Sequence, residues 1–276
     1  MSTSTIEQIQ RRFDGVVSVP SRRVLQVTSI LLFFVLWSVA VRVSFLGFDK
    51  FVGPEVALAA LAEALAGAPM TDGGETLYEH AALSAFRVVV AVLIAMAIAI
   101  PLGLTIGTSR RWEDALFPAL EVFRPVPPVA WVPIALLLLP TFRSGVLFVV
   151  FLGAFFPILI NTIEGVETVE REYVQAASSL GAGSSQIFRH VIIPATMPSI
   201  ITGVSLGVGL AWITVVAAEM IAGGVGIGYI IFQAYRLLDT PTVAVGMIAI
   251  GILGYASAAL VHRIGHRLTR WQETSD

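Results

Sequence analysis

Six stretches of about 20 or more residues contain no charged side chain, and they constrain this chain more than any other feature. A helix needs roughly 20 mostly apolar residues to cross the hydrocarbon core of a bilayer. The sequence therefore predicts an all-α, polytopic membrane protein with about six transmembrane helices. The predicted spans are Val24–Val41, Val88–Ser109, Pro125–Phe142, Ser144–Ile163, Val191–Ala218 and Thr240–Val261.

The composition supports a membrane-embedded chain. Only 13% of the residues are charged and the mean hydropathy is +0.85, whereas soluble domains usually carry about 25% charged residues. The run Met220–Tyr235 is also uncharged, but four glycines interrupt it. We expect a re-entrant or surface-lying element there, because irregular backbone is tolerated at membrane depth only against protein or water.

Basic residues predict the orientation of the spans. With a cytoplasmic N-terminus, the cytoplasmic segments hold twelve of the 17 lysines and arginines and the outer segments hold the other five, as the positive-inside rule requires. Both termini are therefore predicted to be cytoplasmic in a multi-pass protein of the cell's inner (plasma) membrane. The expected parts are a cytoplasmic segment (1–23), a first span (24–44), a membrane core (80–265) with a cytoplasmic loop (172–194), and a tail (266–276).

The chain lacks the residues of an ATPase. Its only lysine lies in Phe48-Asp49-Lys50-Phe51, whereas a P-loop needs Gly-Lys-Ser/Thr to hold the nucleotide phosphates. It contains no cysteine, which excludes disulfides and thiolate metal sites. We expect no catalytic residue, metal, cofactor or nucleic-acid site in this chain, so that any ATP and Mg²⁺ it depends on are used by a partner.

The cytoplasmic loop is predicted to form a helix–turn–helix. Apolar residues at i, i+3, i+4 and i+7 form one stripe of a helix; they are Tyr173, Ala176, Ala177 and Leu180. Gly181 suits the end of this helix, and Ser184 is the predicted N-cap of a second short helix that leads to a span near Pro194. The small alanines of the stripe allow another protein surface to come close.

This loop resembles the cytoplasmic signature of permeases from ATP-binding-cassette (ABC) importers. That signature reads Glu-Ala-Ala, three residues, Gly, nine residues and Ile-x-Leu-Pro. Here Gln175-Ala176-Ala177 precedes Gly181 and Val191–Pro194 at the same spacing, with Gln175 in place of the usual Glu. The resemblance implies a coupling loop that docks on an ATPase, and an ordinary amphipathic loop is the alternative. The residues expected to carry the coupling are Tyr173, Gln175, Ala176, Ala177, Leu180, Gly181, Ala182, Phe188, Arg189 and Pro194.

Further stretches narrow the resemblance to the permeases for taurine, alkanesulfonates, nitrate and bicarbonate. Arg124–Pro133 is similar to their Arg-Pro-x-Pro-Pro-x-Ala-Trp-x-Pro sequence, and Phe155–Thr162 and Ala211–Ile221 are similar as well. The likeness covers roughly Leu25–Trp271. It implies the MetI-like fold of type I importers, a homodimer with the pathway at its interface, two ABC ATPase subunits and an extracytoplasmic substrate-binding protein. The implied function is the import of a small anion by alternating access.

Six residues are candidates for the translocation pathway. Ionisable groups at membrane depth are costly and usually line a pathway or pair with each other, and Arg124 precedes a proline-rich run that cannot form a regular helix. The alternatives are that Arg124 only marks the cytoplasmic edge and that Glu219 forms a structural ion pair. The candidates are Arg124, Pro127, Trp131, Gly207, Trp212 and Glu219.

Two further patterns concern helix faces. His80, Ser84 and Arg87 fall at i, i+4 and i+7 and face one way, which predicts a contact with the binding protein; a snorkelling arginine with a capping partner is the alternative. Small residues recur every four positions in the fifth span, at Ser199, Gly203, Gly207 and Ala211, and this spacing favours close helix packing.

A stand-alone secondary transporter or channel is the alternative function. Such proteins more often show inverted repeats or charged residues near the middle of a span. The sequence shows no obvious repeat, and its predicted spans are uncharged, so the importer subunit is favoured.

Overall fold

The computed structural model describes residues 22–43, 52–71 and 73–269. Within them the secondary structure is helical apart from one isolated β-bridge between Pro69 and Thr76, so the all-α prediction is confirmed. The chain divides into two compact units, residues 1–59 and 60–276.

The first unit contains α2 (Arg22–Arg42) and the start of α3 (Pro54–Leu65). The 21 residues of α2 coincide with the first predicted span, and its apolar stretch Val27–Arg42 is shorter than the roughly 20 residues that usually cross a bilayer. Its large apolar side chains, including Phe33 and Leu36, are exposed within the unit, which suits a helix that faces lipid or other membrane helices. The cytoplasmic segment predicted for 1–23 lies almost wholly outside the described residues.

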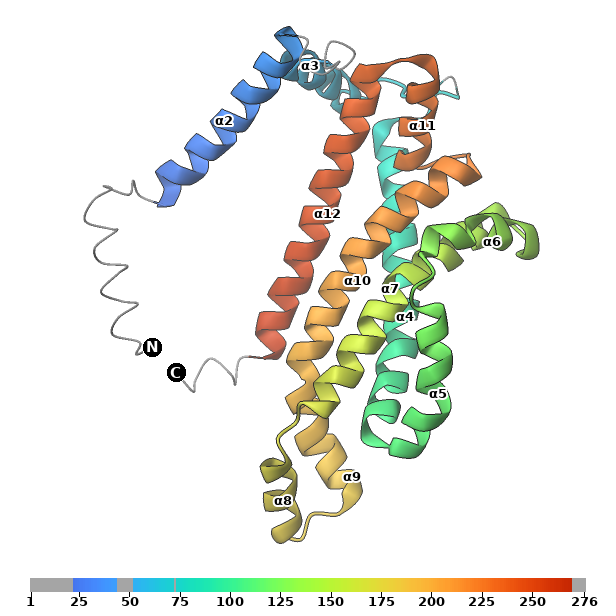
Figure 1. The fold of residues 1–276 in the computed structure, drawn as a ribbon. Coiled ribbons are helices and arrows are strands. Elements are labelled where there is room, and N and C mark those ends of the chain that lie inside the picture. Colours follow the sequence, from blue (N-terminus) through green and yellow to red (C-terminus); the bar gives the residue numbers. More distant parts are fainter. Residues whose placement is uncertain (1–21, 44–51, 72, 270–276) are drawn as a thin grey trace. The chain divides into compact units, whose positions relative to one another are not determined.

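The second unit holds the main spans (Figure 1). Four of the described helical stretches are long and apolar enough to cross a membrane. They are α4 (Leu77–Thr108), α7 (Phe142–Glu167), α12 (Thr240–Leu268) and the stretch Ser184–Ala222, which contains α10 (Ile193–Ala222). A bent pair of helices makes a fifth if it is one span. With α2, these elements agree with the prediction of about six spans.

α4 begins well before the predicted span at Val88. Thr76 caps it, and the Thr76 amide donates to Glu79 Oε2 at 2.7 Å, which is half of a capping box. His80, Ser84 and Arg87 are therefore part of the spanning helix and not of an outer loop. The sequence did not show this start because polar side chains interrupt the first turns of the helix.

The proline-rich segment after α4 forms a broken pair of helices and not the single span Pro125–Phe142. α5 (Arg110–Phe123) runs back along α4 (Figure 1), and a 3₁₀ turn η2 (Pro128–Trp131) leads into α6 (Val132–Leu138). The second helical stretch is bent by 81° from α5. The prolines between them cannot donate the amide hydrogen bonds of a continuous helix, so the chain bends there.

α7 is the centre of the second unit and packs against both α4 and α10. Val149, Val150, Ile158 and Leu159 on α7 are fully buried, and together with residues of α4 and α10 they form the main hydrophobic cluster. Because lipid is as apolar as these side chains, close van der Waals packing and not water exclusion holds such helices together.

Small residues bring α10 close to α7, as the four-residue spacing predicted. A β-carbon at Gly203 would lie 2.8 Å from Asn161 Cβ and 3.0 Å from the Pro157 carbonyl oxygen of α7. Gly207 is similarly tight, with the Ala154 carbonyl oxygen 3.1 Å from the β-carbon position. The packing interpretation of this stripe is confirmed.

A short helix closes the end of the unit opposite α8. α11 (Ile227–Leu237) follows the glycine-rich loop and packs on α10 and α12. Ile227 and Ile230 of α11 are buried with Ala64, Leu77 and Val245 in a second hydrophobic cluster. The uncharged run Met220–Tyr235 is therefore the end of α10, a loop and most of α11.

Replacing Gly203 by alanine tests the α7–α10 contact. The added methyl group meets backbone atoms of α7 that cannot rotate away, so we expect Gly203→Ala to lower the free energy of unfolding by about 1–3 kcal/mol. Gly209 has no heavy atom within 4 Å of its β-carbon position, and Gly209→Ala is the matched control with no loss. Unfolding of both variants in detergent is the measurement, and equal stability of the two would contradict the packing described.

Candidate functional site

The predicted coupling loop forms a helix–turn–helix at one end of the second unit (Figure 1). α8 (Arg171–Ser179) and α9 (Ser184–Ile187) are joined by a turn at Gly181. Gly181 has φ = 85° and the Ala182 amide donates to the Ala177 carbonyl at 3.0 Å. This is the Schellman helix end, in which glycine adopts the left-handed conformation without steric cost.

The second helix of the loop begins differently from the prediction. The N-cap is Gly183 and not Ser184, and the Gly183 amide donates to Gln186 Oε1 at 2.9 Å. From there the chain continues through a π-helical turn, η3 (Phe188–Ile192), directly into α10. The loop is thus joined to a span by helix, and Pro194 lies in the first turn of α10.

Apolar side chains of this loop are open to solvent. Leu180 is 89% exposed and Tyr173 is 58% exposed. Beside Leu180, a pocket of about 340 Å³ is lined by Ala177, Gln186 and His190 among others. Burying a leucine side chain is worth about 1.5–3 kcal/mol, so a partner surface that covered Leu180 would gain free energy from it.

The break after α5 carries a pair of opposite charges. Arg124 Nη1 lies 3.5 Å from Glu121 Oε1, and both side chains are about half exposed at 52% and 51%. A helix rises about 1.5 Å per residue, so Arg124 lies roughly 20 Å from the turn that joins α4 to α5. Arg124 is thus separated from that turn by the length of α5, and whether it lies at the cytoplasmic edge or in a pathway stays a prediction.

Charges that lie at membrane depth require water or protein around them. In a single chain, Arg124, Glu121 and the following Pro127 are open, while the Trp131 ring packs at 6.1 Å from that of Phe123. The broken pair of helices therefore presents a charged break that a second protein surface or an aqueous path has to cover.

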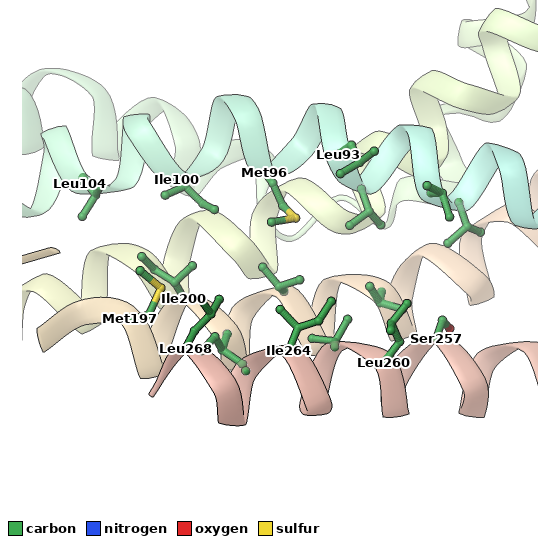
Figure 2. A pocket seen from close by; sticks show the side chains of 18 of the residues that line it. Leu93, Met96, Ile100, Leu104, Met197, Ile200, Ser257, Leu260, Ile264 and Leu268 are labelled. Carbon is green, nitrogen blue, oxygen red and sulfur yellow. The ribbon is translucent and has the colours of Figure 1, made fainter. Parts of the chain in front are cut away.

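The large groove between α4, α10 and α12 has a different character (Figure 2). It encloses about 410 Å³ and aliphatic side chains line it, among them Leu93, Ile100, Ile200 and Ile264. Ser257 is a polar exception, but its hydroxyl accepts from Trp212 Nε1 at 2.9 Å and donates within α12. An anion would lose its hydration there without replacement, so this groove does not suit an anion.

A buried ion pair joins α4 to α10 at the α11 end of the unit. Arg87 Nη1 donates to Glu219 Oε1 at 2.6 Å, and the two side chains are 9% and 1% exposed. The Ser84 hydroxyl lies 2.8 and 2.9 Å from the two Glu219 oxygens, and the Gly228 amide donates to Oε2 at 3.0 Å. The carboxylate is thus fully hydrogen-bonded, which a buried charge requires.

The same side chains hold the glycine-rich loop between α10 and α11. Ser84 Oγ accepts from the Ile227 amide at 3.0 Å, His80 Nδ1 accepts from the Gly226 amide at 2.9 Å, and Arg87 Nη1 donates to the Val225 carbonyl at 2.8 Å. Gly226 has φ = 151°, and a β-carbon there would overlap the Glu219 carboxylate. We call His80, Ser84, Arg87 and Glu219, with the loop 225–228, the latch.

The latch unites residues that the sequence had assigned to separate roles. His80, Ser84 and Arg87 do share one face of α4, but they are 0%, 0% and 7% exposed. They are closed to a soluble partner in this conformation, where they bind the loop before α11, and the contact with a binding protein stays a prediction. In this conformation the Arg87 side chain does not extend to the membrane surface, because its charge is paired with Glu219 inside the protein.

One signal in the sequence would have found this pair. Glu219 closes a run of uncharged residues, and a carboxylate at membrane depth needs a cation at the same depth. Arg87 directly precedes the uncharged run Val88–Ser109, and Glu219 directly follows the run Val191–Ala218. The two runs are predicted to cross the membrane in opposite directions, so Arg87 and Glu219 are expected on the same side. The contribution of Ser84 and of the loop amides depends on the conformation of the loop, which no sequence pattern indicates.

Two other pathway candidates are packing residues in this chain. Gly207 faces the α7 backbone, and Trp212 is 5% exposed with its indole bonded to Ser257. Like Glu219, they are covered by the helices of their own chain, and their part in a pathway stays a prediction. Among the six candidates, only Arg124, Pro127 and Trp131 lie on the open broken pair.

A double-mutant cycle tests the latch. Arg87→Met or Glu219→Gln alone leaves the other group buried without its partner, and we expect each to lower the free energy of unfolding by about 3–5 kcal/mol. The double variant removes both charges, so its loss is expected to be smaller than the sum of the two. Strictly additive losses in detergent unfolding experiments would show that the two side chains do not interact.

No group of three or more His, Cys, Asp or Glu side chains in the described part of the chain is arranged to hold a metal ion. The geometry instead offers a projecting apolar loop, a charged break within a span, and a latch at the opposite end. These features define a helical membrane protein with an exposed apolar loop at one end.

The chain belongs to the family described as binding-protein-dependent transport system inner membrane component, whose sequence profile matches residues 99–272. It is similar to the nitrate import permease protein of Synechocystis sp., with 40% identity over 184 residues, 67% of this chain and 66% of that protein. It is also 34% identical over 196 residues to the taurine transport system permease protein of Escherichia coli K12, covering 71% of each.

A solved structure supports the fold. A chain of the MetNI methionine ABC transporter, solved in inward-facing conformations, superposes with a TM-score of 0.58 at 18% identity, over 70% of this chain and 94% of that chain. The predicted family and the MetI-like fold are therefore confirmed, and this chain is an ABC importer permease of the group that includes nitrate and taurine permeases.

Proposed function

We propose that this chain forms the pathway of an ABC importer for a small anion and is moved by a separate ATPase. The permease family and the anion permeases among its relatives support this. In the assembly, two copies of the chain face each other, two ATPase subunits use ATP and Mg²⁺, and an extracytoplasmic binding protein delivers the anion. Access to the anion alternates between the two sides as the ATPase pair closes and opens.

The proposed orientation places the α8–α9 loop in the cytoplasm. The C-terminal part of α12 lies at the same end, since Gly265 packs against Ile201 near the start of α10. The basic residues counted along the sequence favour this side as the cytoplasmic one. α11 and the latch are then at the extracytoplasmic end.

The observation that carries the proposal is the exposed surface of the α8–α9 loop. It combines the open Leu180, the shallow pocket beside it and a helical connection into α10. Exposed apolar patches outside the membrane are typical of protein–protein contacts. A groove on an ATPase that received this loop would therefore move α10 directly.

Leu180→Glu tests the coupling surface. A charge placed against an apolar groove loses its hydration, so we expect the ATPase subunit that co-purifies in mild detergent to fall roughly tenfold or more per permease. Leu238→Glu is the control, because Leu238 is also open, at 81%, but lies at the other end. Mass spectrometry of the purified complexes measures both ATPase and binding protein.

Two results would contradict the coupling proposal. One is full ATPase retention by Leu180→Glu. The other is anion transport by the chain alone in liposomes without ATP, in which case the stand-alone secondary transporter would replace the importer. Since the chain has no cysteine, a single cysteine introduced at position 180 also gives an unambiguous cross-link to the ATPase.

The charged break after α5 is the best candidate for the anion pathway. Arg124 is the exposed cation there, and Glu121 is a partner it can leave, because exposed pairs of this kind contribute little, about 0–1 kcal/mol. A second copy of the chain facing this break would enclose it. Arg124 could then donate charge-assisted hydrogen bonds to a passing oxyanion.

Arg124→Gln is expected to lower uptake of the transported anion by roughly tenfold or more, since hydrogen bonds to charged groups are worth about 1.5–3 kcal/mol. Arg124→Lys keeps the charge and should retain part of the uptake. Arg143→Gln is the control, an exposed arginine at the start of α7. Uptake of labelled nitrate and taurine into proteoliposomes with the full complex is measured, and unchanged uptake by Arg124→Gln would remove this residue from the pathway.

A further inference from the structure

A small polar pocket lies at the α11 end of the second unit, apart from the loop and from the charged break. It encloses about 220 Å³ between the residues after α3, the last turns of α11 and the start of α12. Thr71, Gln233, Leu237, Asp239 and Thr242 are among its lining residues. Binding sites for small molecules usually measure about 300–1,000 Å³, so this pocket suits a single inserted side chain better than a free ligand.

Two polar side chains of the pocket, Gln233 and Asp239, contribute acceptor oxygens. Gln233 Oε1 is buried without a hydrogen-bond partner among the described residues. Asp239 contributes a carboxylate, and one of its oxygens accepts from the Thr242 amide at 3.3 Å as the N-cap of α12. A buried acceptor left without a partner costs about 1–3 kcal/mol, so a donor that entered the pocket would recover this cost.

A second carboxylate lies beside the pocket. The Thr71 hydroxyl donates to Glu75 Oε2 at 2.5 Å, and this hydrogen bond holds the pKa of Glu75 below its ordinary value. The carboxylate therefore stays charged at neutral pH. Arg236 is exposed on the same helix as Gln233 but does not line the pocket, so the charges at the pocket itself are negative.

The rim of the pocket is apolar. Leu237 is 68% exposed, and Pro69, Met70 and Ala234 also line the pocket. An apolar rim around buried acceptors and a carboxylate matches the lysine or arginine side chain, whose aliphatic stem packs on apolar groups while its head donates hydrogen bonds.

We propose that this pocket is a socket for a lysine or arginine side chain of the extracytoplasmic substrate-binding protein. The identity of the partner rests on the proposed function, which places this end outside the cell membrane and requires such a protein there. Charge complementarity selects the basic side chain, and the exposed rim supplies the surrounding contact.

The socket also has a connection to the spans. Gln233 and Leu237 belong to α11, whose first residues the latch holds through the Ile227 and Gly228 amides. A binding protein that fills the socket would therefore act on α4 and α10 together. Docking of the binding protein would in this way affect α10, which is continuous with the α8–α9 loop.

The test uses the full complex in nanodiscs with the binding protein found by co-purification. ATPase activity is measured against the concentration of loaded binding protein. Asp239→Asn keeps the N-cap oxygen and removes the charge, while Gln233→Met removes the acceptor at similar volume. We expect the half-maximal concentration to rise roughly tenfold for Asp239→Asn and less for Gln233→Met, with unchanged maximal activity. Salt should raise the half-maximal concentration of binding protein less for Asp239→Asn than for the natural chain.

Glu63→Gln is the matched control, an exposed carboxylate of α3 outside the pocket, and it should leave the half-maximal concentration unchanged. Equal behaviour of all three variants and the natural chain would overturn the socket while leaving the importer intact. Shifts seen only when phosphatidylethanolamine is present would also overturn it, because the occupant would then be a lipid ammonium group. If the natural complex showed no stimulation by the binding protein, the proposed function itself would fail.

Discussion

The ion pair between Arg87 and Glu219 is the interaction on which the α11 end of this chain depends. Two charges inside a membrane protein are costly, and they are tolerated here because Ser84 and the Gly228 amide complete the hydrogen bonds of the carboxylate. The carboxylate in turn holds the loop through the Gly228 amide, and the buried Ile227 packs in the second hydrophobic cluster. α11 therefore has a defined position although the loop before it is rich in glycine.

The two ends of the second unit differ in what they leave uncovered. At the α11 end the charges of the latch are enclosed and paired with each other, while the socket and Leu237 beside it are open. At the α8–α9 end a leucine and a tyrosine are open, and the break after α5 leaves an arginine and a glutamate open between the two ends. These uncovered groups are the ones for which the proposed importer supplies partners, namely the ATPase, the second copy and the anion.

The sequence predicted the spans and the α8–α9 loop because both depend on local patterns. Runs without charge and the stripe ending at Leu180 require no knowledge of distant contacts, and Gly181 marks the turn by its own conformation. The sequence did not predict that α4 begins at Leu77, because polar residues interrupt its first turns. It also did not predict that α5 returns along α4, because the prolines after α5 lie inside an uncharged run that resembles a single span. The latch was missed for a different reason: most of its hydrogen bonds join residues more than 130 positions apart, and three of its five donor groups are backbone amides.

The direct continuation of α9 through η3 into α10 has a mechanical consequence. The stretch from Ser184 to Ala222 comprises 39 residues and is about 58 Å long at the usual rise of a helix. The stretch is helical from the loop at one end to Glu219 near the other, and the π-helical turn Phe188–Ile192 and Pro198 are the places where it can bend. On that length, a tilt of about 5° displaces the far end by about 5 Å. A small rotation of the loop on a partner is thus enough to shift the opposite end of the chain by more than the width of a water molecule.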